Sequence, residues 1–93
     1  MNPHALAAEL EKLSGEFSAM TEEAARLDMA RPLALMEYRA TVKTQAEAVN
    51  LWEASERGQR LIYLKWILDA NSKRQSAIKA VLRQAEQEAR GTM

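Results

Sequence analysis

Few side chains in this sequence could carry out acid–base, metal or nucleophilic chemistry. The one histidine is His4, and the 93 residues include no cysteine, so neither a disulfide nor a thiolate metal site can form. Glu22 and Glu23 are adjacent, but neighbouring residues of a helix point about 100° apart, whereas paired acid–base carboxylates share one cleft. No glycine-rich phosphate loop or nucleophile elbow is present either. We therefore expect no enzyme activity, no bound metal and no cofactor.

Aromatic and arginine side chains in the second half of the chain are better candidates, and they indicate binding. Trp, Tyr and Arg are enriched at the centres of protein interfaces. The same aromatic residues could instead form the core of a helical bundle, and stacking on single-stranded bases is a third alternative. The candidate partner interface consists of Tyr38, Trp52, Arg60, Tyr63, Trp66 and Arg74.

The charged residues are distributed unevenly, although the net charge is zero. Residues 1–30 carry six acids and two bases, a charge of −4, so the rest of the chain carries +4. An acidic first segment beside a basic later one favours pairing within the chain or between subunits. Arg60 and Arg74 border the apolar stripe of their segment and could pair with glutamates of the first helix.

Residues 57–83 hold seven bases and one acid, Asp69. On a helical projection, a group of these bases lies mostly opposite the apolar face, where basic side chains are usually only solvated. The alternative is a phosphate-binding face, whose affinity for nucleic acid would fall with added salt. The candidate phosphate-binding residues are Lys65, Lys73, Lys79 and Arg83. The overall neutrality of the chain makes nucleic acid the less favoured partner.

Helices must position these side chains, because the composition is rich in helix formers and includes only three glycines and two prolines. We expect a first helix over about residues 3–27, with Asn2 as its N-cap and Pro3 in its first turn. Its apolar residues alternate spacings of four and three, a heptad pattern typical of a coiled-coil-like seam. The expected packing seam contains Leu6, Leu10, Leu13, Phe17, Met20, Ala24 and Leu27.

Pro32 predicts a boundary after this helix, because proline disfavours a helical conformation in the preceding residue and fits a first helical turn. We expect a turn at about 28–31 and a second helix over about 32–54. Near Gly58 the apolar stripe shifts register, and Ser55 could cap a new helix. Either the chain breaks at about 55–59 and a third helix covers about 60–89, or one long helix continues through a stutter.

The segment from Tyr63 to Arg90 ends in the run IKAVLRQAEQEAR. It resembles the C-terminal part of small helical proteins of tailed phages, several of which are encoded near recombination or DNA-replication genes. The resemblance lies in size, helix layout and heptad spacing, and it carries no catalytic motif. It implies a phage-derived protein that acts beside DNA-processing proteins.

These features predict a single all-α domain over residues 1–93, with two or three long amphipathic helices in an antiparallel hairpin or bundle. We expect coiled-coil-like packing and a homo-oligomer, because burial of one helix face would not offset the entropy lost by ordering an isolated helix. The expected function is a protein–protein interaction module that oligomerises, or that binds and modulates a larger DNA-processing or host-defence protein. The alternative is a nucleic-acid-binding accessory factor in phage recombination or replication, which uses the basic segment 57–83.

The expected cellular location follows from the longest apolar stretch of the sequence, at about residues 61–68. Lys65 interrupts this stretch, which is too short and too polar to span a bilayer. We therefore expect no membrane association and a place in the cytoplasm, that of the host cell if a phage encodes the protein.

Overall fold

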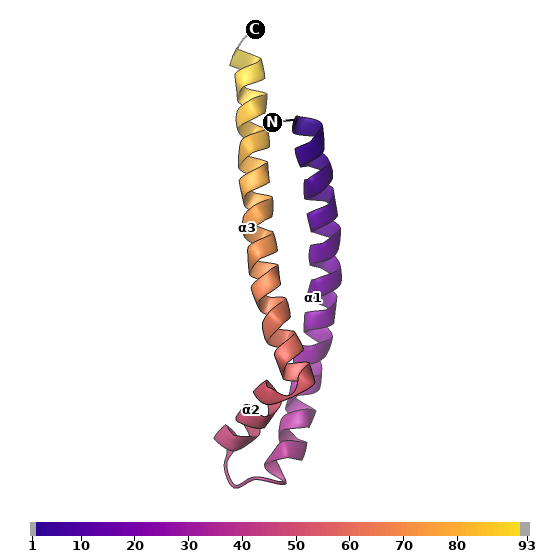
Figure 1. Cartoon of the computed structure of the whole chain (residues 1–93), viewed down its shortest axis with the longest axis vertical. Coiled ribbons are helices and arrows are strands. Elements are labelled where there is room, and N and C mark those ends of the chain that lie inside the picture. Colours follow the sequence, from indigo (N-terminus) through magenta and orange to yellow (C-terminus); the bar gives the residue numbers. More distant parts are fainter. Residues whose placement is uncertain (1, 92–93) are drawn as a thin grey trace.

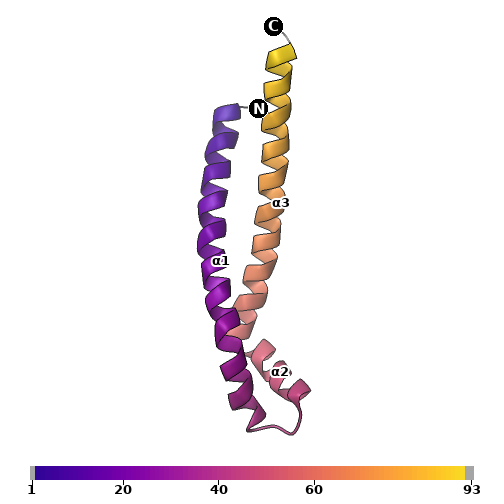
Figure 2. The ribbon, with the colours of Figure 1, turned by 180° about the vertical axis from the view of Figure 1, so that it is seen from behind.

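The computed structural model describes residues 2–91, which form three α-helices and, within that range, no strand. α1 spans Pro3–Arg39, α2 spans Gln45–Ala54 and α3 spans Glu56–Gly91. α1 and α3 run antiparallel and side by side, while the short α2 packs at the end where the chain turns (Figure 1, Figure 2). The molecule is a rod of 70 × 19 × 16 Å. The prediction of an all-α fold is confirmed.

The turn predicted at residues 28–31 is wrong, because α1 continues through Pro32 to Arg39. Proline in a helix interior removes one N–H, here the donor for the Asp28 carbonyl, and costs about 3 kcal/mol. Pro32 and Asp28 are both exposed, so water can satisfy that carbonyl. Beyond the proline, the helix gains core packing from Ala34, Leu35 and Tyr38. This burial offsets the lost hydrogen bond.

α2 begins at Gln45 and not at about residue 32, since residues 40–44 form the connection. Thr44 is the N-cap, and its hydroxyl accepts the backbone N–H of Glu47 at 3.2 Å. The Glu47 carboxylate in turn accepts the backbone N–H of Lys43 at 3.3 Å. Such reciprocal bonds satisfy donors that a helix start leaves free. Local capping therefore fixes where α2 starts.

The chain is broken near Gly58, as one of the two alternatives predicted, and the continuous helix is wrong. The break is one residue long, because Ser55 alone separates α2 from α3, which begins at Glu56 and not at about residue 60. The Ser55 hydroxyl caps α3 by accepting the N–H of Gly58 at 3.1 Å. A Cβ on Gly58 would overlap the carbonyl oxygen of Trp52. The tight corner therefore requires glycine at this position.

The core lies at the three-helix end of the rod. Trp52 of α2 is its largest member, and it packs with Ala24 and Ala34 of α1 and with Leu61 and Leu64 of α3. Toward the other end only α1 and α3 meet, and the last turns of α3 extend past the start of α1 (Figure 1). Packing is therefore densest near the corner and thinnest near residues 2 and 91.

Candidate interaction surface

The predicted packing seam of α1 lies against α3 along the rod. Leu6 and Ala24 are buried, whereas the other seam residues are half-buried: Leu10, Leu13, Phe17, Met20 and Leu27. The stripe on α3 has the same heptad spacing: Leu61, Leu64, Leu68, Asn71, Gln75, Ile78, Leu82 and Ala85. Much of each stripe is only half covered, because over most of the rod each helix has a single neighbour.

A polar pair interrupts the α3 stripe at Asn71, which is 6% exposed. The Asn71 amide nitrogen donates to the backbone oxygen of Leu13 at 3.0 Å, and its side-chain oxygen accepts from Gln75 at 2.6 Å. Helices that slide past each other would leave this buried amide unpaired, so it favours one alignment. Apolar periodicity alone does not find Asn71. The sequence signal for this pair is that the heptad spacing continues from Leu68 to Ile78 through two polar residues, Asn71 and Gln75.

The pairing that the charge pattern indicated between α3 arginines and α1 glutamates is present. The Arg60 guanidinium donates twice to the Glu23 carboxylate, at 2.6 and 2.9 Å. Arg74 donates twice to Glu9, both at 2.9 Å. These hydrogen bonds hold the pKa of Glu9 and of Glu23 below the usual 4.5. Such partly exposed pairs stabilise a fold modestly, but their two-pronged geometry helps to fix the alignment of the helices.

The aromatic candidates separate into buried and exposed residues. The prediction that Trp52 contacts a partner is wrong, because its side chain is 2% exposed and lies in the chain's own core. The Arg57 guanidinium lies 5.3 Å from its ring. Tyr38 is half-buried and packs against the same core. Tyr63 and Trp66 lie on the outside of α3 and are 55% and 77% exposed. These two residues are the aromatic side chains that a partner could reach.

The four candidate phosphate-binding residues do not form a compact site. Lys65 lies 3.6 Å from Asp28 of α1, and Lys73 lies 2.9 Å from a carboxylate of its own helix. No ion pair of Lys79 or Arg83 is found within residues 2–91. Lys65 and Arg83 are about 27 Å apart along α3 at 1.5 Å per residue. Internal pairs therefore partly neutralise the basic segment.

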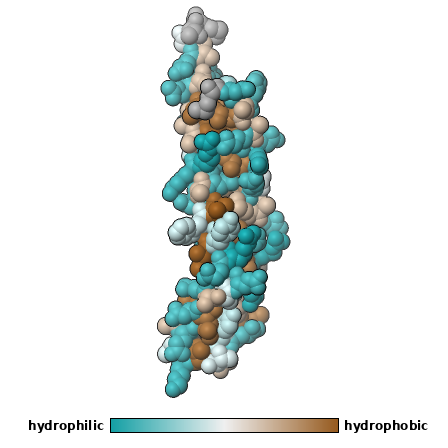
Figure 3. Space-filling model, viewed as in Figure 1, coloured by the Kyte–Doolittle hydropathy of each residue, from teal (hydrophilic) through white to brown (hydrophobic). Residues whose placement is uncertain are grey.

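Three large apolar residues on α1 are exposed and share a face: Met29, Leu33 and Met36, at 81%, 63% and 70%. Apolar patches alternate with polar ones along the rod (Figure 3). The turn predicted at 28–31 concealed this face, because it assigned Met29 and Leu33 to different elements. These residues lie off the packing seam, so the seam pattern gives no signal for them.

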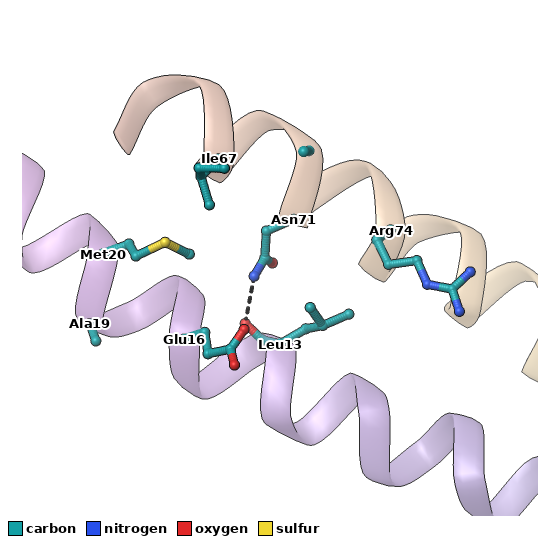
Figure 4. Close-up of a pocket in the computed structure, with 8 residues that line it drawn as sticks. Leu13, Glu16, Ala19, Met20, Ile67, Asn71 and Arg74 are labelled. Atoms are coloured by element: carbon teal, nitrogen blue, oxygen red, sulfur yellow. Dashed lines mark hydrogen bonds between the residues drawn. The ribbon is translucent and has the colours of Figure 1, made fainter. Parts of the chain in front are cut away.

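A groove of about 450 Å³ opens between α1 and α3 beside Asn71 (Figure 4). Its walls are mainly apolar and include the small side chains of Ala19 and Ala70. Glu16 of α1 and Arg74 of α3 also line it. No sequence motif predicts this groove. Alanine is common in helices because it favours helix formation, so Ala19 and Ala70 do not stand out in the sequence.

The remaining chemical candidates stay apart from one another. His4 is exposed, and Glu22 lies 3.6 Å from Arg26 of its own helix, whereas Glu23 pairs with α3. Residues 2–91 contain no group of three or more acidic or histidine side chains that could hold a metal ion. Over the same residues, none of the helices has an apolar stretch long enough to cross a membrane. Comparisons with protein-family models, curated proteins and solved structures gave no match.

Proposed function

We propose that this chain is a small helical protein–protein interaction module that oligomerises, or that binds and modulates a larger protein. The observation that carries this proposal is the exposed aromatic pair Tyr63 and Trp66 on α3. Trp and Tyr are enriched among the residues that dominate binding energy. Large exposed apolar side chains that gather on one surface mark interaction sites.

The rod-like shape supports the same function. An antiparallel hairpin with coiled-coil-like packing offers a partner helix the half-covered stripes of α1 and α3, in the manner of helix-in-groove recognition. The resemblance to small phage proteins makes a DNA-processing or host-defence protein the proposed class of larger partner. Modulation would then follow from occupying a surface that this partner uses.

Sedimentation equilibrium combined with affinity capture from a bacterial lysate tests this function. The intact chain should self-associate or retain a protein, and Trp66→Ala should lose that association. Ser72→Ala is the matched control, because Ser72 is exposed and lies on another side of α3. A strictly monomeric chain that retains nothing would overturn the proposal.

The second candidate function, a nucleic-acid-binding accessory factor, is favoured by one observation. Lys79 and Arg83 lie four residues apart, and no ion pair of either is found within residues 2–91. Fluorescence anisotropy with single- and double-stranded DNA at two salt concentrations tests it, because phosphate contacts are strongest at low salt. Binding that Lys79→Glu with Arg83→Glu abolishes would support it. A lack of binding at low salt would exclude it.

A further inference from the structure

α3 carries a second heptad stripe on its outer side, away from α1. At 3.6 residues per turn, Trp66 lies about 160° around the helix from Leu64 and from Leu68, which face α1. Exposed residues with alternating spacings of three and four continue along this outer side of α3. The outer stripe consists of Tyr63, Trp66, Ala70, Lys73, Ala77 and Ala80.

The composition of the outer stripe is that of a packing seam. It includes one charged residue, Lys73, and no acid. Ile62 and Val81, at 41% and 37% exposed, extend its apolar surface, because each lies one helical turn from a member of the stripe. A heptad stripe of apolar side chains is a surface on which a second helix packs by inserting side chains between its residues. The outer stripe therefore indicates a helix as its partner.

The order of side-chain sizes along the outer stripe indicates which helix this is. Trp66 and Ala77 lie about 8 Å to either side of the level midway between residues 71 and 72, at 1.5 Å per residue. Tyr63 and Ala80 lie about 13 Å to either side of the same level. A copy of α3 running in the opposite direction about this level would place each aromatic ring on an alanine. Large side chains facing small ones let the two layers interdigitate.

We propose that a second copy of this chain packs on the outer stripe, with the two α3 helices antiparallel about a two-fold axis level with residues 71 and 72. Trp66 of each copy then lies against the second copy's Ala77, and Tyr63 lies against the second copy's Ala80. Such a contact uses the same patch on both copies, so every match occurs twice. The inference rests on the proposed function and specifies its partner, surface and alignment.

Charge complementarity near the axis supports this occupant. Lys73 lies 2.9 Å from Asp69 of its own helix, and the two side chains are 78% and 65% exposed. The antiparallel alignment brings the second copy's Asp69 level with residue 74, next to Lys73. Since an ammonium group has three donors, Lys73 can keep its own partner and also contact the second carboxylate. A parallel pair would instead set Lys73 against the second copy's Lys73, an unfavourable contact between like charges.

The Tyr63 ring is held in place by its own chain. The Arg60 guanidinium lies 5.5 Å from the centre of this ring and donates to Glu23 of α1 at 2.6 Å. A side chain that is already ordered loses less entropy when a partner binds. The ion pairs of Arg60 and Arg74 with α1 stay intact, because the proposed contact uses neither guanidinium.

The surface area of the rod supports a second copy as well. The accessible surface is 6938 Å², whereas a compact monomer of 10.5 kDa has about 5,400 Å². The excess of roughly 1,500 Å² is larger than the about 800 Å² that each partner buries in a standard interface. The rod therefore exposes enough surface for a contact of that size.

Exchanging two facing residues tests the alignment. Trp66→Ala should raise the dimer Kd by at least about 30-fold, because a central aromatic contact is lost. Ala77→Trp should also weaken the dimer, because two indoles then compete for one space. Both changes in one chain should improve the affinity by at least about 10-fold over either single variant, because each indole again faces an alanine.

Sedimentation equilibrium of the full chains measures each Kd, and circular dichroism checks that helicity is unchanged. Residues 66 and 77 are both exposed, so the single hairpin should keep its fold in these variants. Ser72→Trp is the matched control, because it adds an indole on another exposed side of α3 and should leave the dimer intact. The tryptophan emission of the unchanged protein should move to shorter wavelength as concentration rises, because Trp66 becomes buried.

Cross-linking tests the direction of the two helices. Residues 2–91 include no cysteine, so Gln59→Cys and Gln84→Cys each introduce a single thiol on an exposed site. The antiparallel alignment places residue 59 beside the second copy's residue 84 and leaves the two residues 59 about 38 Å apart. A short bis-maleimide should therefore link the two variants to each other when they are mixed. Ser72→Cys should link to neither.

Several results would overturn the proposal. These are a monomeric intact chain, a double variant that binds no better than the single ones, or cross-links that join residue 59 to residue 59. If Ala77→Trp does not fold, Trp66→Ala and the cross-links decide the question. A monomeric chain that still retains another protein through Trp66 would reject the second copy alone and leave the proposed interaction function in place.

Discussion

At the scale of single residues, Gly58 shows how one missing side chain sets the shape of the molecule. The carbonyl oxygen of Trp52 occupies the place that a Cβ would need, and the Ser55 hydroxyl binds the Gly58 N–H. The sequence locates this corner, because Ser55 and the shift of the apolar stripe are both visible. It does not reveal that glycine is required, since that depends on how closely α2 approaches α3.

Gly58→Ala should therefore lower the free energy of unfolding by at least about 2 kcal/mol, because the corner must open to admit the methyl group. Urea denaturation followed by circular dichroism measures this change. Gly15→Ala is the control, because nothing lies within 4 Å of its added Cβ, and it should gain about 0.5–1 kcal/mol in a helix interior. Equal effects of the two substitutions would contradict the account of the corner.

Asn71 belongs to the same scale, and its expected contribution is alignment more than stability. Asn71→Leu should leave the melting temperature unchanged or raise it, because an apolar residue suits a buried heptad position. The variant should also lose the single alignment of α1 and α3 that the bond to Leu13 favours. Amide NMR spectra with extra or broadened signals would show this. A large loss of stability with one sharp set of signals would count against it.

At the scale of the helices, the sequence locates the start of α1 and the corner at Ser55, but it misplaces the end of α1 and the start of α2. Asn2 with Pro3 at α1, and Ser55 at α3, are local signals whose chemistry acts within one turn, and the structure uses them. The end of α1 depends on Ala34 and its neighbours packing against Trp52, which lies far along the chain. A local rule for proline cannot weigh that distant contact, so the predicted turn at 28–31 was wrong.

The persistence of α1 through Pro32 makes a prediction of its own. Pro32→Ala restores a backbone N–H at position 32, which can donate to the Asp28 carbonyl, and it removes the proline ring. The free energy of unfolding should therefore rise by as much as about 3 kcal/mol. Pro3→Ala is the control and should change little, because a first-turn proline has no intrahelical bond to lose. Thermal and urea unfolding would measure both. A destabilised Pro32→Ala variant would show that the proline ring itself contributes to the stability of α1.

The two ion pairs between α1 and α3 predict a dependence on pH. The Arg74 and Arg60 hydrogen bonds hold the pKa of Glu9 and of Glu23 below 4.5 in the folded chain. Their contribution is therefore complete above the unfolded pKa and is lost as the pH falls below 4.5 through the folded values. Melting curves from neutral to acidic pH should show this decline.

A matched pair of variants isolates this effect. Glu9→Gln with Glu23→Gln should flatten the acidic part of the melting profile, because the amides do not titrate. Glu11→Gln is the control on an exposed part of α1. An unchanged profile in the double variant would assign the acid sensitivity to other carboxylates.

At the scale of the whole molecule, stability is concentrated at the three-helix end. Trp52, Leu61 and Leu64 are buried there, whereas the last turns of α3 lie beyond the start of α1 (Figure 1). Hydrogen exchange should therefore be slowest in residues 24–38 and 52–64 and fastest in residues 83–91. Uniform protection along the rod would contradict this gradient. The heptad spacing predicts long helices but not this gradient, which arises from the way α2 folds back.

The antiparallel path of α1 and α3 also determines how the molecule would respond to mechanical load. Residues 2 and 91 lie at the same end of the rod, away from the corner (Figure 1), so a force pulling them apart acts across the helices. The contacts would then break one after another, beginning near Leu6 and Ile78 and reaching the Trp52 core last. Such a peeling path needs little force at any moment, whereas pulling between residue 2 and the corner would shear every contact at once. The same hairpin would thus be weak in one direction and resistant in the other.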